Sequence, residues 1–206
     1  MIMSIFDLTD KNTVPDNTSE YENIIAVTNR SICSHPFLEQ IERVCMHHPK
    51  ALIQREKDLS EEDYILLADP VIKLCRQYEV LCIPHSYTAA SRKLLQPHIH
   101  LPLPLLRQYQ GTLTDFKTIG CSVHSVQQAQ EAQALGATYL TAGHIYATDC
   151  KKGLPPRGLD FLEEVCDRVE IPVYAIGGIH PGTGQLSEVM AHKAAGACIM
   201  SDMMNI

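Results

Sequence analysis

Short apolar runs recur along the chain and constrain its fold more than any other feature. They are 24–28, 51–54, 80–83, 99–101, 117–123, 137–141, 173–176 and 197–200. Most are separated by stretches with the apolar spacing of amphipathic helices, such as 36–47 and 125–135. Strands that alternate with helices predict parallel βα units, and unbroken apolar strands are typical of a sheet covered on both faces.

The number of runs favours a (β/α)8 TIM barrel over an open doubly wound sheet. Open sheets of that kind usually have fewer strands and a glycine-rich turn after the first one. Here the residues after the first run are Thr28-Asn29-Arg30. We expect a polar N-terminal arm over 1–20 and a single TIM-barrel domain over 21–206.

Prolines and serines predict where some of the helices begin or break. Ser60 and Ser125 are placed to cap helices over 60–78 and 125–135. Pro70 is expected to start a new turn or to kink the first of these. Because Pro102 and Pro104 should bend the chain, only a weak helix or turn is expected after them.

Composition excludes several classes of function. The formal net charge is -7, and no basic stripe with interleaved aromatic residues occurs, so nucleic acid is not an expected partner. No apolar run is long enough to span a membrane. The eight cysteines are scattered singly, without a Cys-x-x-Cys pair, which favours reduced thiols in a cytoplasmic protein.

Polar residues gather where the predicted strands end, and the active site of a TIM barrel is built at these carboxyl ends. They are Arg55, Lys57, His85, His100, Ser122, His124, His144, Ser201 and Asp202. A single histidine at such a place is often a hydrogen-bonded core residue. Several histidines at one barrel mouth favour a catalytic or binding site.

A glycine pair and a charged loop predict anion binding. Gly177-Gly178 follows the seventh run, where glycine lets the backbone approach a phosphate closely, and Ser201 follows the eighth. The loop after the sixth run carries Lys151 and Lys152, which could hold a phosphate or a carboxylate. An ordinary turn and a solvated basic loop are the simpler alternatives for these segments.

His124 is the candidate acid–base residue, because a histidine exchanges protons near neutral pH. A metal site would need more ligands. Cys121 and His124 point to opposite faces of a strand, and no carboxylate cluster completes a site with them or with His98 and His100. We therefore expect neither a metal nor another cofactor.

Four segments resemble the thiamine phosphate synthase/TenI superfamily, over about residues 24–203. They are Gln-Arg-Glu-Lys-Asp-Leu (54–59), Ser-Val-His-Ser (122–125), Ala-Gly-His-Ile-Tyr-Ala-Thr-Asp-Cys-Lys-Lys-Gly (142–153) and Ile-Pro-Val-Tyr-Ala-Ile-Gly-Gly-Ile (171–179). The resemblance implies a TIM barrel of thiamine biosynthesis. The loop over 142–153 is most similar to the TenI branch, whose members are thiazole tautomerases.

Two departures separate the chain from the synthase branch. Synthases place acidic residues after the third and fourth strands, where they hold magnesium against a pyrophosphate. Here these positions read Pro84-His85 and Leu101-Pro102-Leu103-Pro104-Leu105, without an acid. Arg55, Lys57, Ser122 and Lys151 do match positions of the synthase pyrophosphate site.

The resemblance therefore implies an isomerase that aromatises a thiazole carboxylate phosphate without a cofactor. His124 would move the ring proton, and Arg55 and Lys152 would face the carboxylate. Gly177, Gly178 and Ser201 would bind the phosphate. The alternatives are a thiamine phosphate synthase, or a non-catalytic barrel that binds thiazole or thiamine phosphates in regulation.

The chain ends at Ile206, whereas family members usually continue with a final helix. The barrel is therefore expected to lack the helix that covers the eighth and first strands. The N-terminal arm, or a second copy in a homodimer, would cover that surface. This ending also puts the Ser201 half of the phosphate site in question.

Overall fold

The computed structural model describes residues 18–148, 151 and 153–206. Its eight strands are β1 (Ile24–Val27), β2 (Ala51–Gln54), β3 (Leu81–Pro84), β4 (His98–Pro102), β5 (Thr118–Val123), β6 (Tyr139–Gly143), β7 (Val173–Ile176) and β8 (Gly196–Ile199). All the strand pairs are parallel, in the order β3-β2-β1-β8-β7-β6-β5-β4. Each of the eight predicted runs contributes a strand.

The two outer strands of this order meet at one point and nearly close the barrel. A single parallel bridge joins His85, directly after β3, to His100 in β4. Beside it, the Ser86 backbone N–H donates to the His100 carbonyl over 2.9 Å. The predicted (β/α)8 TIM-barrel fold is confirmed, and the seam between β3 and β4 is its least hydrogen-bonded junction.

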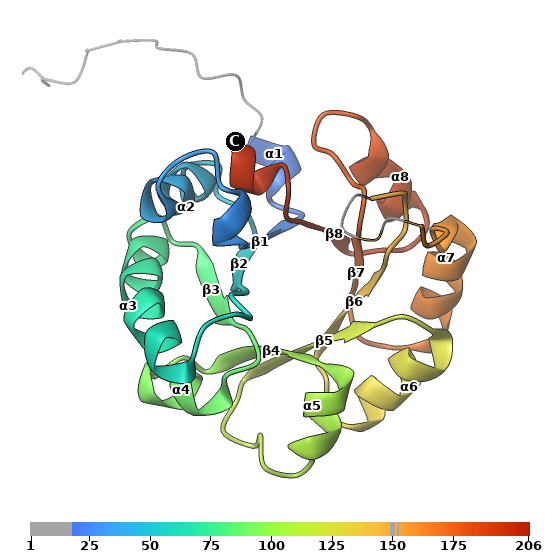
Figure 1. The fold of residues 1–206 in the computed structure, drawn as a ribbon. Coiled ribbons are helices and arrows are strands. Elements are labelled where there is room, and N and C mark those ends of the chain that lie inside the picture. The colour runs from blue at the N-terminus through green and yellow to red at the C-terminus, as the bar shows by residue number, and fades with distance from the viewer. Residues whose placement is uncertain (1–17, 149–150, 152) are drawn as a thin grey trace, which may run out of the picture.

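Helices form a ring around the strands (Figure 1). They are α1 (Thr18–Tyr21), α2 (Phe37–Met46), α3 (Glu61–Gln77), α4 (Thr88–Lys93), α5 (Leu103–Gln108), α6 (Val126–Ala134), α7 (Gly158–Arg168) and α8 (Gln185–Ala191). The main hydrophobic core lies between the strands and these helices, and a second, smaller cluster fills the barrel interior. No helix in the described part of the chain is long and apolar enough to cross a membrane.

Side-chain caps begin two helices as predicted, and the structure shows where the prolines lie in theirs. Ser60 Oγ accepts from the Asp63 backbone N–H at the start of α3, and Ser125 Oγ accepts from that of Gln128 at the start of α6. Helix α3 continues through Pro70. Pro104 lies in the first turn of α5, where a proline costs no helical hydrogen bond, so a helix begins directly after β4.

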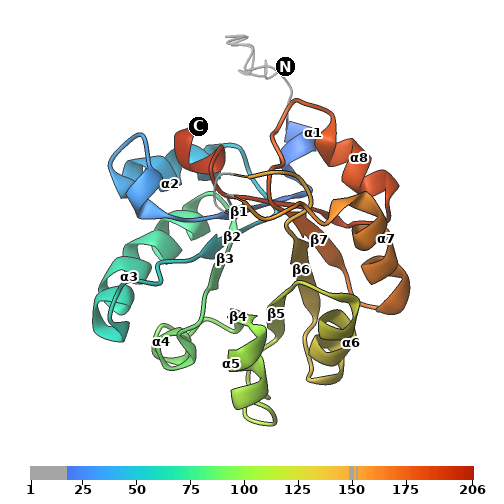
Figure 2. The ribbon, with the colours of Figure 1, turned by 45° about the vertical axis from the view of Figure 1, so that its right-hand side comes forward.

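The described chain begins with α1, which lies against β1, and its last residues lie against α2 (Figures 1 and 2). Residues 1–17 of the expected polar arm lie outside the described residues, and 18–20 belong to α1 rather than to a loose arm. After β8, residues 200–206 contain a 3-10 helix, η3 (Met203–Asn205), and no α-helix. Met203 and Met204 are fully buried, and Gln40 of α2 donates to the Met203 carbonyl over 2.9 Å.

Candidate active site

A cavity of about 690 Å³ opens at the carboxyl ends of the strands. All the predicted site residues within the described chain line it, namely Arg55, Lys57, Ser122, His124, Lys151, Gly177, Gly178 and Ser201. Lys152 lies outside the described residues. The fold thus gathers the candidates at one mouth.

A buried carboxylate holds the segment that carries Arg55 and Lys57. Glu56 is 3% exposed and accepts hydrogen bonds from Thr28 Oγ1 (2.6 Å) and Arg30 Nη1 (3.0 Å). Thr28 Oγ1 in turn accepts from the Arg55 backbone N–H over 2.9 Å. Anchoring Glu56 holds the segment after β2 in place, and both of its basic neighbours line the cavity.

Positive charge concentrates on this wall. The pKa of Lys57 is lowered, first by partial desolvation and then by the charges of Arg55 and Lys151. Within the described part of the chain, no carboxylate forms an ion pair with any of these three side chains. An anionic ligand would relieve their mutual repulsion, so this wall is suited to a carboxylate or a phosphate.

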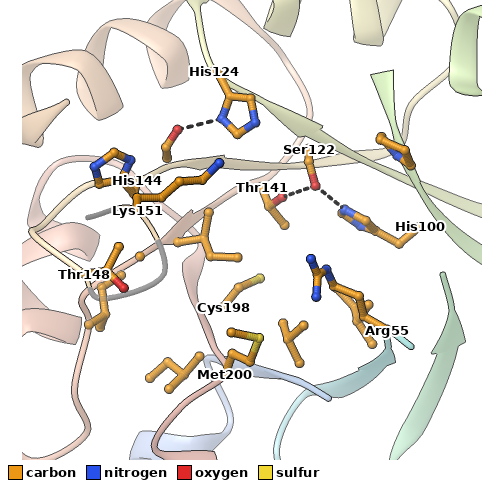
Figure 3. Close-up of a pocket in the computed structure, with 18 of the residues that line it drawn as sticks. Arg55, His100, Ser122, His124, Thr141, His144, Thr148, Lys151, Cys198 and Met200 are labelled. Carbon is orange, nitrogen blue, oxygen red and sulfur yellow. Dashed lines mark hydrogen bonds between the residues drawn. The ribbon is translucent and has the colours of Figure 1, made fainter. Parts of the chain in front are cut away.

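His124 lies at the cavity mouth, directly after β5, with one ring nitrogen fixed (Figure 3). Its Nδ1 is 2.8 Å from the Gly143 carbonyl oxygen at the end of β6. A carbonyl only accepts hydrogen bonds, so Nδ1 carries the proton. Nε2 has no hydrogen-bond partner among the described residues, and in the neutral ring it keeps a lone pair for a proton.

His85 and His100 stack on each other at the seam between β3 and β4, with ring centroids 5.5 Å apart. Burial lowers the pKa of His100 to about 3, with further lowering by Arg55 and Lys57. Burial, then His100 and the same two cations, also place the pKa of His85 well below its usual value. Both rings are therefore neutral at physiological pH, and His85 lies at the end of β3, where the synthases have acidic residues according to the resemblance.

Gly177 and Gly178 line the cavity, but close packing already requires glycine at both positions. A Cβ on Gly177 would lie 2.4 Å from His144 Cβ, and one on Gly178 would lie 2.3 Å from the Ala147 carbonyl oxygen. Both glycines also have positive φ, at 101° and 69°. The pair therefore lets the loop after β6 cross β7 closely, whether or not a phosphate binds there.

Two features of the cavity were missed at the sequence level. His180 Nδ1 lies 2.8 Å from an Asp202 carboxylate oxygen, which links the loops after β7 and β8. Apolar side chains form the remaining wall and suit a flat ring; they are Val27, Ile53, Ile176, Cys198 and Met200. These residues come from β1, β2, β7 and β8 or directly follow them, so no local sequence pattern connects them.

Comparison with known proteins agrees with this architecture. The family model described as thiamine monophosphate synthase (TMP-TENI) matches residues 24–203. A thiamine-phosphate synthase of Fusobacterium nucleatum is 31% identical over 161 residues, covering 76% of this chain and 78% of that protein. Thiamine-phosphate synthase 2 of Streptococcus pneumoniae is 30% identical over 184 residues, covering 86% and 85%.

A solved structure supports the same assignment. Thiamine phosphate pyrophosphorylase from Pyrococcus furiosus superposes with a TM-score of 0.76 at 25% identity, covering 91% of this chain and 90% of that one. The family model spans every strand end that forms the cavity, and the relatives and the solved structure cover three quarters of the chain or more. The chain belongs to the thiamine monophosphate synthase family of TIM-barrel proteins, which serve thiamine biosynthesis.

Proposed function

We propose that the protein is an isomerase of the thiazole tautomerase type, which moves a proton within a thiazole carboxylate phosphate. The observation that carries this proposal is the hydrogen bond between His124 Nδ1 and the Gly143 carbonyl, which leaves Nε2 as a base at the cavity wall. An allylic proton shift needs a base, an acid and charge stabilisation, and no cofactor takes part.

In the proposed reaction, His124 Nε2 removes a proton from a ring carbon. The electron pair of the broken C–H bond enters the ring, the double bond moves by one position, and a new C–H bond forms at its far end. The imidazolium of His124 holds the proton in the meantime and can return it. A positioned histidine of this kind typically accelerates such a step by about a hundred- to ten-thousand-fold.

The remaining wall residues would bind the substrate. Arg55 and Lys57 would face the carboxylate, with Lys152, which lies outside the described residues, as a further predicted contact. The thiazole ring would lie against Ile53, Ile176 and Met200. Gly177, Gly178 and Ser201 would receive the phosphate, for which the cavity has room.

The residues at the ends of β3 and β4 do not fit a magnesium ion. Magnesium prefers oxygen ligands in an octahedral arrangement. In this place the chain offers the imidazoles of His85 and His100 and the apolar start of α5, with Arg55 and Lys57 nearby. Asp202, on the opposite side, is bound to His180. We therefore derive no step through a metal–pyrophosphate complex.

Thiamine phosphate synthase is the second candidate, because the relatives described above carry that name. It would join a pyrimidine pyrophosphate to a thiazole phosphate, and Arg55, Lys57, Ser122 and Lys151 suit a pyrophosphate. A barrel that only binds such phosphates is the third. The single domain over 21–206, the homodimer and the cytoplasmic location remain predictions.

One pair of assays separates these candidates. The first follows aromatisation of thiazole carboxylate phosphate by ultraviolet absorbance in the presence of EDTA. The second supplies magnesium, the pyrimidine pyrophosphate and thiazole phosphate, and detects thiamine phosphate. The proposal predicts turnover in the first assay and none in the second. Turnover in the second alone would establish the synthase, and ligand binding without turnover in either would indicate a binding protein.

A further inference from the structure

Three neighbouring strands bring a buried polar network to the floor of the cavity. In the register of the sheet, His100 of β4 pairs with Gly120 of β5, and Gly120 pairs with Tyr139 of β6. The His100 ring spans two partners, with Nδ1 2.9 Å from Tyr139 Oη and Nε2 2.8 Å from Ser122 Oγ. Thr141 Oγ1 lies 3.1 Å from the same Ser122 oxygen (Figure 3).

Gly120 provides the space in which His100 and Tyr139 meet. A Cβ at this position would lie 2.2 Å from Tyr139 Cζ and 2.4 Å from both His100 Nδ1 and Tyr139 Oη. Any other residue at position 120 would therefore push the two rings apart. The contact depends on a glycine whose backbone itself needs no unusual conformation, since its φ lies outside the left-handed region.

The direction of each hydrogen bond follows from counting protons. Tyr139 is 6% exposed and Thr141 is 2% exposed, and within the described residues the hydroxyl of each has one partner. A buried hydroxyl that only accepted would leave its own hydrogen unpaired, which is costly. Tyr139 therefore donates to His100 Nδ1, and Thr141 donates to Ser122.

The direction of the Tyr139 hydrogen bond also determines which nitrogen of His100 carries the proton. A neutral imidazole has one N–H, and because Nδ1 accepts from Tyr139, the N–H is on Nε2 and donates to Ser122 Oγ. The buried position of His100, 2% exposed with Arg55 and Lys57 close by, opposes a second proton. Both lone pairs of the Ser122 oxygen are thus occupied, one by His100 and one by Thr141.

We infer that this network makes Ser122 an obligatory hydrogen-bond donor into the cavity, with His100 and Tyr139 as its positioning residues. Ser122 lines the cavity and is partly exposed, so its remaining hydrogen points toward the ligand. The ligand atom at this place is an anionic oxygen, of a carboxylate or a phosphoryl group, which Arg55 and Lys57 attract to the same wall. The inference deepens the proposed function, on which it rests for the ligand class only.

The proton positions are tested first in the native protein. Two-dimensional 1H–15N NMR of the imidazole nitrogens distinguishes a proton on Nε2 from one on Nδ1. The network predicts Nε2–H for His100 at pH 7, and in the Tyr139→Phe variant, where nothing donates to Nδ1, the preference for this tautomer should decrease. A native His100 with its proton on Nδ1 would overturn the inference, and this measurement requires neither a substrate nor turnover.

The role of Ser122 is tested with inorganic pyrophosphate as a compact anionic probe, titrated by calorimetry into the native protein and the variants Tyr139→Phe, Ser122→Ala and both together. We expect Ser122→Ala to weaken binding about ten-fold, the scale of a hydrogen bond to a charged group. Tyr139→Phe should weaken binding when Ser122 is present and have no further effect when it is absent.

The inference would be contradicted if the two substitutions weakened pyrophosphate binding independently, so that their effects added in the double variant. It would also be contradicted if the native protein did not bind pyrophosphate. Because the probe is not a substrate, these outcomes are separate from the aromatisation assay. Turnover without the predicted coupling would leave the proposed reaction intact and remove only the network from it. Coupling between Tyr139 and Ser122 without turnover would support the network and contradict the proposed reaction.

Discussion

His124 Nδ1 lies 2.8 Å from the carbonyl oxygen of Gly143, on the neighbouring strand of the barrel. The register below this contact is regular, with Val123 of β5 paired to Ala142 of β6. The backbone of one strand therefore sets the tautomer of the histidine that ends the other. This places a basic nitrogen at the cavity mouth without a second side chain to orient it.

Replacing Glu56 by Gln should disturb the basic wall. Glu56 is a buried acceptor for Thr28 and Arg30, and removal of its charge leaves Arg30 without its buried partner. Arg30 is partly exposed and keeps its pair with Asp58, so the loss should be that of hydrogen bonds to a charged acceptor, about 1.5–3 kcal/mol of unfolding free energy. Because the anchored segment carries Arg55 and Lys57, binding of inorganic pyrophosphate should also weaken. Urea denaturation and calorimetry measure the two effects.

Asp58→Asn is the matched control, since Asp58 is bound to the same arginine but its side chain is 69% exposed. An exposed ion pair contributes at most about 1 kcal/mol. Equal losses in Glu56→Gln and Asp58→Asn would mean that Glu56 is not an anchor of the wall.

Acidification should destabilise the protein through the histidines of the β3–β4 seam. The pKa of His100 is about 3 in the folded state, and burial also lowers that of His85, whereas an unfolded histidine titrates near 6.5. Between these values the unfolded chain binds more protons, so stability falls with falling pH. Each histidine contributes a slope of up to about 1.4 kcal/mol per pH unit over this window.

Urea denaturation between pH 5 and 7 measures this slope, above the range in which carboxyl groups titrate. In the His100→Gln variant the contribution of this ring is absent, and the slope should decrease accordingly. A variant with the native slope would show that His100 is not held neutral in the folded protein.

Gly120→Ala should damage both the fold and the cavity floor. The added methyl group would meet the rings of His100 and Tyr139, and overpacking of this kind costs about 1–3 kcal/mol. Since Ser122 depends on His100, pyrophosphate binding should weaken as well. Gly111→Ala is the control, because its Cβ meets nothing within 4 Å and only its positive φ opposes the change. The Gly111→Ala variant should lose stability but keep its affinity for pyrophosphate. An equal loss of pyrophosphate binding in both variants would contradict the account.

The strands were predictable from sequence because a strand buried on both faces reads as an unbroken apolar run. The weak helix expected after Pro104 begins earlier, at Leu103, because a proline in the first turn of a helix replaces an N–H that has no partner. The glycine pair at 177 and 178 was predicted for a phosphate, whereas the loop after β6 already demands it. Such a requirement arises between segments some thirty residues apart.

The cavity was predicted from the rule that barrel sites lie at strand carboxyl ends, and the described candidates do line it. The hydrogen-bond network was not predictable, because it depends on the register of β4, β5 and β6. The positions of His85 and His100 were visible in sequence, but their neutrality results from burial and from Arg55 and Lys57. The protonation state of these histidines therefore follows from the folded structure and not from their positions in the sequence.

The most direct test of the central claim is a single-turnover measurement with thiazole carboxylate phosphate, in EDTA, comparing native protein with His124→Gln at saturating enzyme. The account predicts a rate at least a hundred-fold lower in the variant, because the base is lost. The dissociation constant for the substrate should change by less than about three-fold, since the anion-binding residues remain. His192→Gln, at a half-buried histidine outside the cavity, should keep the native rate. A native rate in His124→Gln would contradict the account.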